Sequence, residues 1–420
     1  MRKIHYGWWI FLSTCVISLV GFGMVVDTIG LFFDPVSASF HISRAGVSLM
    51  VTFQNIACAI TLLFAGKLME KVNIRWLLTI CFSIIGLGFI SLAFAHNIIQ
   101  FYIVWTIIGI MQPFALTLSI PVLLGNWFQK YLGTVMGIAL GLSAIGGSLF
   151  NPIISSVITS SGWRAGWILE GAITLIAILP FTIFVVRYKP TGNTKPFGYS
   201  EENANQTSTT SFEGLSFKQA LRTPMFYLIS FAMIALQWVA GLVQHVSPYI
   251  VSINLPLTLG ATVVSGIMLG AAAGKVSIGW CLDHFNNRAV IILYSIFGIV
   301  GWLSLIVVRA SGLLVAAGFV LGLGQGIMLV SLPYFIRKQF GPKDYNNILS
   351  IISMFGNFST AIAVSVNGRI FDITRSYNIP LMTNGVLYVL GGGAVVLSIV
   401  LSSRYIKKLN NNGNDTQKNF

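Results

Sequence analysis

The sequence predicts an all-α integral membrane protein with twelve transmembrane helices in two six-helix bundles. Composition is the first observation behind this prediction: 55% of the 420 residues are hydrophobic and 9% are charged. A soluble domain carries roughly 25% charged residues, and the mean hydropathy here is +0.82. A chain with so few charges cannot cover a water-facing surface, so lipid must be its solvent.

Twelve apolar stretches are the second observation, and each can supply the roughly 20 residues that one crossing needs. They are expected at about Trp8–Phe33, Val47–Met69, Trp76–Ala95, Gln100–Trp127, Gly133–Ser160, Trp167–Val186, Phe226–Val251, Leu257–Leu282, Ala289–Val308, Leu313–Ile336, Ile348–Phe371 and Leu381–Tyr405. A polar segment without a spanning run separates the sixth stretch from the seventh. We therefore expect an N-terminal bundle (1–186), a cytoplasmic linker (187–224), a C-terminal bundle (225–407) and a polar cytoplasmic tail (408–420). Within the linker, SFKQALRTP is typical of a short interfacial helix.

An internal repeat is the third observation. GKLMEKVNIR (66–75) and GWCLDHFNNR (279–288) match at an offset of 213 residues, and the same offset pairs Gly109 with Gly322 and Gln112 with Gln325. An ordered series of matches across half the chain indicates a duplication. Two six-helix halves related in this way form one of the known transporter layouts.

The distribution of basic residues predicts the orientation. With the N-terminus inside, 19 of the 25 Lys and Arg residues fall on the cytoplasmic side, and Lys275 remains within the membrane. Both termini are therefore expected in the cytoplasm, in a multi-pass protein of the cytoplasmic membrane. This bias accounts for most of the net charge of +14, so nucleic acid is not an expected partner. The first apolar run is too long for a signal peptide.

The doubled turn, the two halves and the linker together resemble the major facilitator superfamily, whose usual turn reads G-x-L-x-D-R-x-G-R. Glu70 stands here for the acid of the first copy, and Asn73 and Asn286 stand for the second glycine. Asparagine tolerates a left-handed backbone, which we expect at both positions. The resemblance implies the major facilitator fold.

The resemblance also implies that the two turns are gates that latch the outward-facing state. We expect their acids to form ion pairs with the nearby arginines, or to face a helix N-terminus across the bundle interface. The gate residues are Gly66, Glu70, Arg75, Gly279, Asp283 and Arg288.

A narrower resemblance is carried by YGWWI (6–10), DTIGLFFDPV (27–36), NWFQKYLGTVMGIALG (126–141), the LRTPMFYL entry to the seventh span and GRIFDITRSY (368–377). These motifs are similar to those of the monocarboxylate porter and oxalate:formate antiporter branch. The branch moves small organic acids, often with a proton or in exchange. It implies a small organic acid as substrate and a proton as coupling ion.

Lys275 is the main candidate for substrate binding or coupling. Inserting a lysine at the centre of a spanning helix into the membrane costs about 2.5–3.5 kcal/mol, so a lysine at this position indicates a functional role or a route to water. The resembling branch usually has an arginine here that engages the substrate carboxylate. The alternative is that the side chain snorkels to water.

Asp27, in the first span, stands where the branch has a lysine. A pair with Lys275 across the cavity would satisfy both charges without substrate. Protonation of Asp27 would then free Lys275 for a carboxylate and couple transport to protons. The alternative is an acid at a packing interface with a local hydrogen bond.

Other polar residues are weaker candidates for the cavity: His245, Asn357, Tyr249 and Gln112. His245 matches a position where the branch often has histidine, with packing as its alternative. Asn357 replaces the second cation of dicarboxylate exchangers, which argues against a dianion. Glu170, beyond Arg164, is expected to be a local ion pair or an interfacial acid.

The sequence therefore predicts a secondary active transporter that moves a small monocarboxylate by alternating access, with proton symport favoured over exchange. The alternatives are a zwitterion such as an amino acid, an organic-anion exchanger, or a non-transporting membrane sensor. The five histidines are scattered and the four cysteines lack metal-ligand spacing, so no enzyme activity, cofactor or metal is expected. We expect the lipid bilayer as the remaining partner and a functional monomer.

Overall fold

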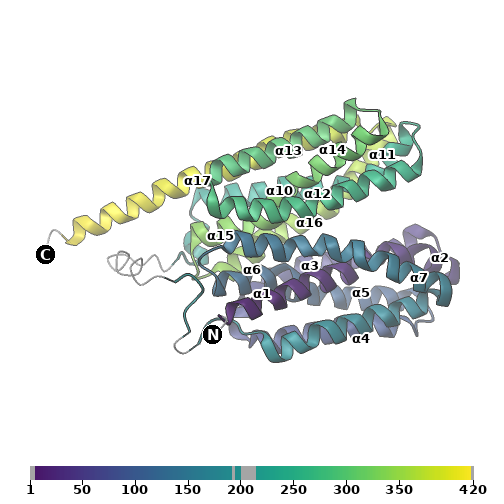
Figure 1. Ribbon diagram of the computed structural model, residues 1–420, viewed down its shortest axis with the longest axis horizontal. Helices are drawn as coiled ribbons and strands as arrows, with labels where there is room; N and C mark the ends of the chain where they lie inside the picture. Colours follow the sequence, from purple (N-terminus) through teal and green to yellow (C-terminus); the bar gives the residue numbers. More distant parts are fainter. Residues whose placement is uncertain (1–4, 192–193, 200–213, 418–420) are drawn as a thin grey trace.

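The computed structural model describes residues 5–191, 194–199 and 214–417, which form a bundle of helices (Figure 1). Eleven helical segments are long and apolar enough to cross a membrane. One of them, Leu132–Val185, has 54 residues, more than twice the roughly 20 that one crossing needs. It breaks at Gly162, whose φ of 82° is left-handed. This segment therefore supplies two crossings, and the described part of the chain contains the twelve that the sequence predicts.

The helices form two halves that lie side by side along their length (Figure 1). The N-terminal half, drawn purple to teal, consists of α1 (Gly7–Val16), η1 (Ile17–Asp27), η2 (Ile29–Phe32), α2 (Phe33–Phe40), α3 (Arg44–Lys71), α4 (Ile74–Leu92), α5 (Ile98–Gln112), η3 (Pro113–Leu118), α6 (Ser119–Trp127), α7 (Leu132–Pro180) and η4 (Phe181–Val185). The C-terminal half, drawn green to yellow, consists of α10 (Pro224–Val243), α11 (Val246–Ser252), α12 (Leu257–His284), α13 (Asn287–Val307), α14 (Ser311–Gly324), η5 (Ile327–Ser331), α15 (Leu332–Phe340), α16 (Tyr345–Thr374) and α17 (Asn378–Gln417). α9 (Phe217–Ala220) precedes the second half.

Both chain termini lie at one end of the bundle, at the left of Figure 1. We call this end, where α1 begins and α9 lies, the linker end, and the opposite end the far end. The short helix expected in SFKQALRTP is present as α9, which has four residues and is capped by the side chain of Ser216.

The linker is anchored to each half by backbone hydrogen bonds. On the N-terminal half, Phe197 N–H donates to the carbonyl of Trp127 at 2.8 Å. On the C-terminal half, Leu215 N–H donates to the carbonyl of Phe340 at 2.7 Å. The Phe217 N–H donates to Oδ2 of Asp344 at 2.7 Å. Each anchor therefore moves with its own half.

The first span is not a continuous α-helix. After α1 it widens into the π-helix η1, breaks at Thr28 (φ −90°, ψ −17°) and tightens into the 3₁₀ segment η2. π-helical turns are frequent at functional sites. The break places Asp27 and Thr28 at the junction of two helix types.

The fourth and tenth spans contain the same irregularity at corresponding positions. The π-helix η3 follows Gln112, and the π-helix η5 begins two residues after Gln325. These glutamines are paired by the 213-residue offset of the sequence repeat. The local backbone has therefore been duplicated together with the sequence.

Two expected helices differ in extent from the prediction. The seventh span is interrupted at Gln244 and His245, so α10 and α11 replace a single helix. The last helix continues to Gln417, so its backbone extends through most of the segment predicted as a polar tail.

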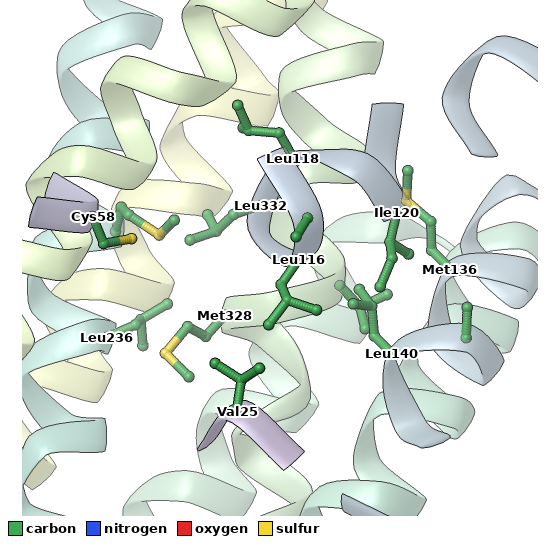
Figure 2. Close-up of a cluster of buried hydrophobic side chains, with 14 of the residues drawn as sticks. Val25, Cys58, Leu116, Leu118, Ile120, Met136, Leu140, Leu236, Met328 and Leu332 are labelled. Atoms are coloured by element: carbon green, nitrogen blue, oxygen red, sulfur yellow. The ribbon is translucent and has the colours of Figure 1, made fainter. Parts of the chain in front are cut away.

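Apolar side chains from both halves meet in the middle of the bundle, as Figure 2 shows for Val25, Leu116 and Leu140 of the first half and Leu236, Met328 and Leu332 of the second. All six belong to the buried core. This central apolar cluster excludes water between the halves.

Candidate functional site

Lys275 lies in the middle of α12 and is 6% exposed. Its Nζ donates a hydrogen bond to Oγ of Ser143 on α7, at 2.9 Å. Because α12 and α7 belong to different halves, the buried cation contacts both. Lys275 therefore does not snorkel out of the membrane in this conformation.

Asp27 is half-buried at the end of η1 and packs over Gly147 of α7. A Cβ on Gly147 would lie 2.8 Å from both Cβ and Oδ2 of the aspartate, so only glycine accommodates it there. Ser143 and Gly147 are one helical turn apart, on the same face of α7 and separated by a rise of about 6 Å. Asp27 and Lys275 therefore converge on a single face of α7.

The charges of Asp27 and Lys275 interact electrostatically, but no direct ion pair joins them among the described residues. Lys275 donates to Ser143 instead. The predicted pair is thus replaced in this conformation by two charges on successive turns of α7. We call Asp27, Ser143, Gly147 and Lys275 the central charge site.

Ser143 and Gly147 were not singled out from the sequence. Small residues are common at helix contacts in membranes, and nothing in the sequence distinguishes these two from packing residues.

Two glycine pairs in the spanning helices have different roles. Gly137 and Gly141 pack against the backbone and side chains of α12 around Lys275 and Val276, at the interface between halves. Gly270 and Gly274 pack instead against α14, within the C-terminal half. Only the first pair lies at the interface between the halves.

The polar candidates Gln112 and Asn357 make hydrogen bonds within their own halves. Gln54 Nε2 donates to Oε1 of Gln112 at 3.0 Å, which links α3 to α5. Asn357 Nδ2 donates to the carbonyl of Ser353, one turn earlier in α16, at 3.0 Å. Neither joins the central charge site in this conformation.

His245 and Tyr249 lie in the far half of the seventh span and bond to neighbouring helices. The His245 ring nitrogens face the Tyr377 hydroxyl at 3.3 Å and the Val364 carbonyl at 3.0 Å. The buried Tyr249 hydroxyl donates to the Leu305 carbonyl at 2.6 Å. These contacts connect the seventh span to the ninth and eleventh, which favours the packing alternative for His245 and gives the Tyr249 hydroxyl a structural partner.

The expectation of a local ion pair or interfacial position for Glu170 is wrong. Glu170 is 0% exposed, and neither of its carboxyl oxygens has a hydrogen-bond partner among the described residues. The guanidinium of Arg164 lies over the Trp163 ring at 4.2 Å and donates to the Ala95 carbonyl at 3.4 Å. Sequence position suggested an interface, whereas the helix places this carboxyl inside the N-terminal half.

Asp283, in the second gate turn, caps the start of α7 across the interface. Its Oδ1 accepts from Gly133 N–H at 3.0 Å. Its Oδ2 accepts from the N–H and the hydroxyl of Thr134, both at 2.6 Å. An acid is stabilised at a helix N-terminus by the free N–H groups and the helix dipole. This is the contact expected for a gate turn.

Glu70, in the first gate turn, makes no equivalent contact with any residue that the structure describes. Asp344, which precedes α16, is close enough to repel it, and Asp344 itself accepts from the linker at Phe217. The first turn is held by neutral groups instead. Gly66 N–H donates to Ser350 Oγ at 3.2 Å, and Asn346 Nδ2 donates to the Tyr188 hydroxyl at 2.7 Å.

Burial raises the pKa of Tyr188, so its hydroxyl stays neutral and remains a hydrogen-bond partner for Asn346. Sequence reasoning missed this bond because Tyr188 lies in the linker, outside the repeat. It also missed Arg337, which donates to the Gly125 carbonyl at 3.0 Å and to Asn126 Oδ1 at 3.2 Å across the interface. Arg337 is one of the residues lining a cavity of about 380 Å³ at the linker end.

The ion pairs expected within the gate turns do not form. Among the described residues, Glu70 does not pair with Arg75, nor Asp283 with Arg288. Arg75 donates to the carbonyls of Val186 and Phe184 at 3.3 and 3.4 Å, where its charge complements the C-terminal end of the sixth span. Arg288 is exposed.

The prediction of a left-handed backbone at Asn73 and Asn286 is also wrong. Both have a φ of −64° with an extended ψ. Each side chain caps the next helix by accepting from the N–H two residues on, at 3.1 Å for Arg75 and 3.0 Å for Arg288. Asparagine is used here as an N-cap.

The two ends of the interface between halves differ in packing. At the linker end, Gly66 contacts the backbone of α16 at Asn346, and Gly279 contacts the backbone of α7 at Gly133. Toward the far end, α7 and α12 have exposed hydroxyl side chains, at Ser155, Ser156, Thr159, Thr258, Thr262 and Ser265. The halves are therefore packed backbone to backbone at the linker end, whereas α7 and α12 present accessible hydroxyl groups toward the far end.

Comparisons with known proteins agree with this architecture. A model of the Major Facilitator Superfamily matches residues 10–364 and 254–416. The Bacillus subtilis uncharacterized MFS-type transporter YcxA is 21% identical over 94% of both chains. The Oxalobacter formigenes oxalate:formate antiporter is 22% identical over 66% of this chain and 60% of its own. The crystal structure of the Escherichia coli fucose:proton symporter covers 92% of this chain and 98% of its own, with 12% identity and a TM-score of 0.71.

Proposed function

The chain belongs to the Major Facilitator Superfamily, and from this membership we propose that it is a secondary active transporter of a small monocarboxylate, driven by proton symport. Membership makes it a multi-pass membrane transporter rather than an enzyme. The substrate and the coupling ion are the proposal.

The convergence of Asp27 and Lys275 on one face of α7 is the observation that carries the proposal. Lys275 supplies a buried cation at the interface between halves, where a carboxylate would contact both. A lysine ammonium offers a point charge without the bidentate geometry of arginine, which suits a single small carboxylate. Asn357 stands at the second cation position of dicarboxylate exchangers, which supports a monoanion over a dianion.

Asp27 supplies the proton-linked step. When it is ionised, its charge attracts Lys275 and opposes an entering anion. When it is protonated, Lys275 is available to a carboxylate. Proton and substrate then bind together, which is the requirement for symport.

The contacts between halves support alternating access. Asp283, Arg337 and the close approach at Gly66 close the linker end, while the central apolar cluster blocks water from passing between the halves. The hydroxyl groups of α7 and α12 provide a polar route from the far end. We place the linker end in the cytoplasm because basic residues concentrate there, which makes this the outward-facing conformation of a protein that works as a monomer.

Solute counterflow in proteoliposomes tests the substrate class. The purified protein is loaded with lactate, pyruvate, formate, alanine or oxalate in turn, with and without a pH gradient. We expect exchange of a monocarboxylate and its accumulation under an inward proton gradient. Uptake of alanine but of no monocarboxylate would favour the zwitterion alternative, and oxalate exchange that ignores the pH gradient would favour an anion exchanger.

Substitution of Lys275 tests the central charge site. We expect Lys275→Ala to reduce counterflow at least 100-fold, because an anion would then enter a site containing only Asp27. Lys275→Arg retains the cation and should keep measurable transport. Full activity of Lys275→Ala would remove Lys275 from the proposed mechanism.

A further inference from the structure

Glu170 is a fully buried carboxyl that lies outside the central charge site. It sits in the sixth span with 0% of its surface exposed. Neither carboxyl oxygen has a hydrogen-bond partner among the described residues. An acid with this burial and no partner requires a physical explanation.

The surroundings of this helix turn are aromatic. Trp167, one turn before Glu170, stacks on Phe32 of η2 at 3.7 Å between ring centroids and on Phe89 of α4 at 5.4 Å. Trp105 of α5 meets Trp167 edge-on at 6.0 Å. Within the described part of the chain, the indole N–H groups of both tryptophans also have no hydrogen-bond acceptor. The turn that holds Glu170 is thus packed against the irregular part of the first span through Phe32.

Thr28 is the polar side chain that faces Glu170. Its hydroxyl donates to the Met24 carbonyl at 3.1 Å, so its proton is not available to the carboxyl. Asp27, the preceding residue, packs over Gly147 on the side of the central charge site. At the break in the first span, Thr28 therefore lies beside Glu170, whereas the preceding residue, Asp27, lies at the central charge site.

The charged groups on the packed elements do not neutralise Glu170. Arg164, on its own helix, bonds to Ala95 and Trp163. Arg75 of α4 bonds to Val186 and Phe184 at the linker end. The remaining titratable groups on these elements include Asp27 of η1, Asp34 of α2, Cys81 of α4, Tyr102 of α5 and His96 before α5, and none of these forms an ion pair with Glu170 among the described residues.

A carboxylate in such surroundings costs several kcal/mol, because no partner replaces its hydration. The neutral acid avoids most of this cost. We propose that Glu170 is a proton-binding site that holds a proton in the present conformation and releases it when the Asp27–Phe32 segment rearranges as the linker end opens. The released proton leaves a carboxyl oxygen for water that enters the opened turn, and a carboxylate remains.

This inference rests on the proposed proton symport, because a proton bound at Glu170 has a role in transport only if protons are transported. It adds a second acid, separated from the substrate path by the break at Thr28. Asp27 responds to the substrate and Lys275, whereas Glu170 responds to the backbone rearrangement of the first span. Proton binding and release at Glu170 would thus be coupled directly to the conformation of the first span.

Infrared spectroscopy of the purified full-length protein in lipid nanodiscs tests proton binding without a substrate. A protonated carboxyl has a carbonyl stretch that a carboxylate lacks. At neutral pH we expect the wild-type protein to show such a band and Glu170→Gln to lose it. Thr174→Val is the matched control, because the buried Thr174 hydroxyl bonds to the Glu170 backbone carbonyl at 2.8 Å and carries no proton site. An identical carboxyl band in wild type and Glu170→Gln would show that Glu170 is ionised and overturn the inference.

A second arm tests the dependence on conformation. Gly66→Trp places a large side chain against the α16 backbone and holds the linker end open. We expect the band assigned to Glu170 to fall at least twofold in this variant. Gly279→Trp, at the corresponding contact with α7, replaces it if the first variant does not fold.

A Glu170 band of unchanged intensity in the opened variant would mean a permanently protonated structural acid, and the release step would be wrong. Neither arm involves substrate. If no monocarboxylate is transported in the counterflow experiment, the proposed substrate class is wrong, but the infrared test of Glu170 can still be interpreted.

Discussion

The two gate turns share their backbone contacts but differ in how their acids are used. In both copies, a glycine packs against the backbone of the opposite half and an asparagine caps the following helix. Asp283 accepts three hydrogen bonds from the start of α7. Glu70 faces the like charge of Asp344 instead.

This difference shows which part of a duplicated motif the fold requires. The glycine contact is steric, since no side chain fits between the two backbones, and it is retained in both copies. The acid contact is electrostatic and can be replaced by neutral bonds such as Gly66 with Ser350. The two gate turns therefore contribute one charged contact and one neutral contact to the linker end, beside the contacts of Arg337.

Among substitutions in the two gate turns, removal of the Asp283 carboxylate is expected to destabilise the closed linker end most. Asp283→Ala should shift the equilibrium toward an open linker end by about 3 kcal/mol, because hydrogen bonds to a charged acceptor are stronger than neutral ones. Hydrogen exchange at Gly133 and Thr134 should accelerate accordingly. Asp283→Asn keeps an acceptor and should give an intermediate rate. Unchanged exchange in Asp283→Ala would show that the cap does not hold the closed state.

The two glycine contacts should respond alike, with a smaller effect. Gly66→Ala and Gly279→Ala each introduce a Cβ into backbone of the other half, at a cost of about 2 kcal/mol for the closed state. Accessibility of cysteines introduced at the linker end measures this opening. A large effect from one glycine alone would mean that the backbone contacts are as asymmetric as the acids.

The smallest effect is expected for Glu70. Glu70→Ala removes repulsion from Asp344 and no hydrogen bond to α16, so the closed state should change by less than about 0.5 kcal/mol. The same exchange measurement, made at the first turn of α16, checks this value. An effect as large as that of Asp283→Ala would show that Glu70 contributes to the closed state in solution.

The fold was predictable because lipid solvation and the repeat leave clear patterns. The twelve crossings follow from the apolar runs, and the paired glycines follow from the 213-residue offset. The π-helical turns after Gln112 and Gln325 were not predicted, although the same offset relates their positions. The conformation of Asn73 and Asn286 did not follow, because asparagine serves both left-handed turns and N-caps.

The candidate site was predictable only in part. Asp27 and Lys275 could be named because charges in spanning helices are rare. Ser143 and Gly147 could not, since their importance depends on which face of α7 meets the other half. The burial of Glu170 depends on the rotation of one helix within the bundle. A position just beyond a predicted loop does not determine that rotation.

The paired anchors of the linker have a mechanical consequence. One anchor lies at Phe197 on the first half and the other at Leu215 on the second. An extended chain covers about 3.3–3.6 Å per residue, so the stretch of sequence between the anchors has a maximum reach of about 60 Å. This length sets an upper limit on the separation of the two anchors, so the relative position of the halves is held by the side-chain and glycine-backbone contacts across their interface.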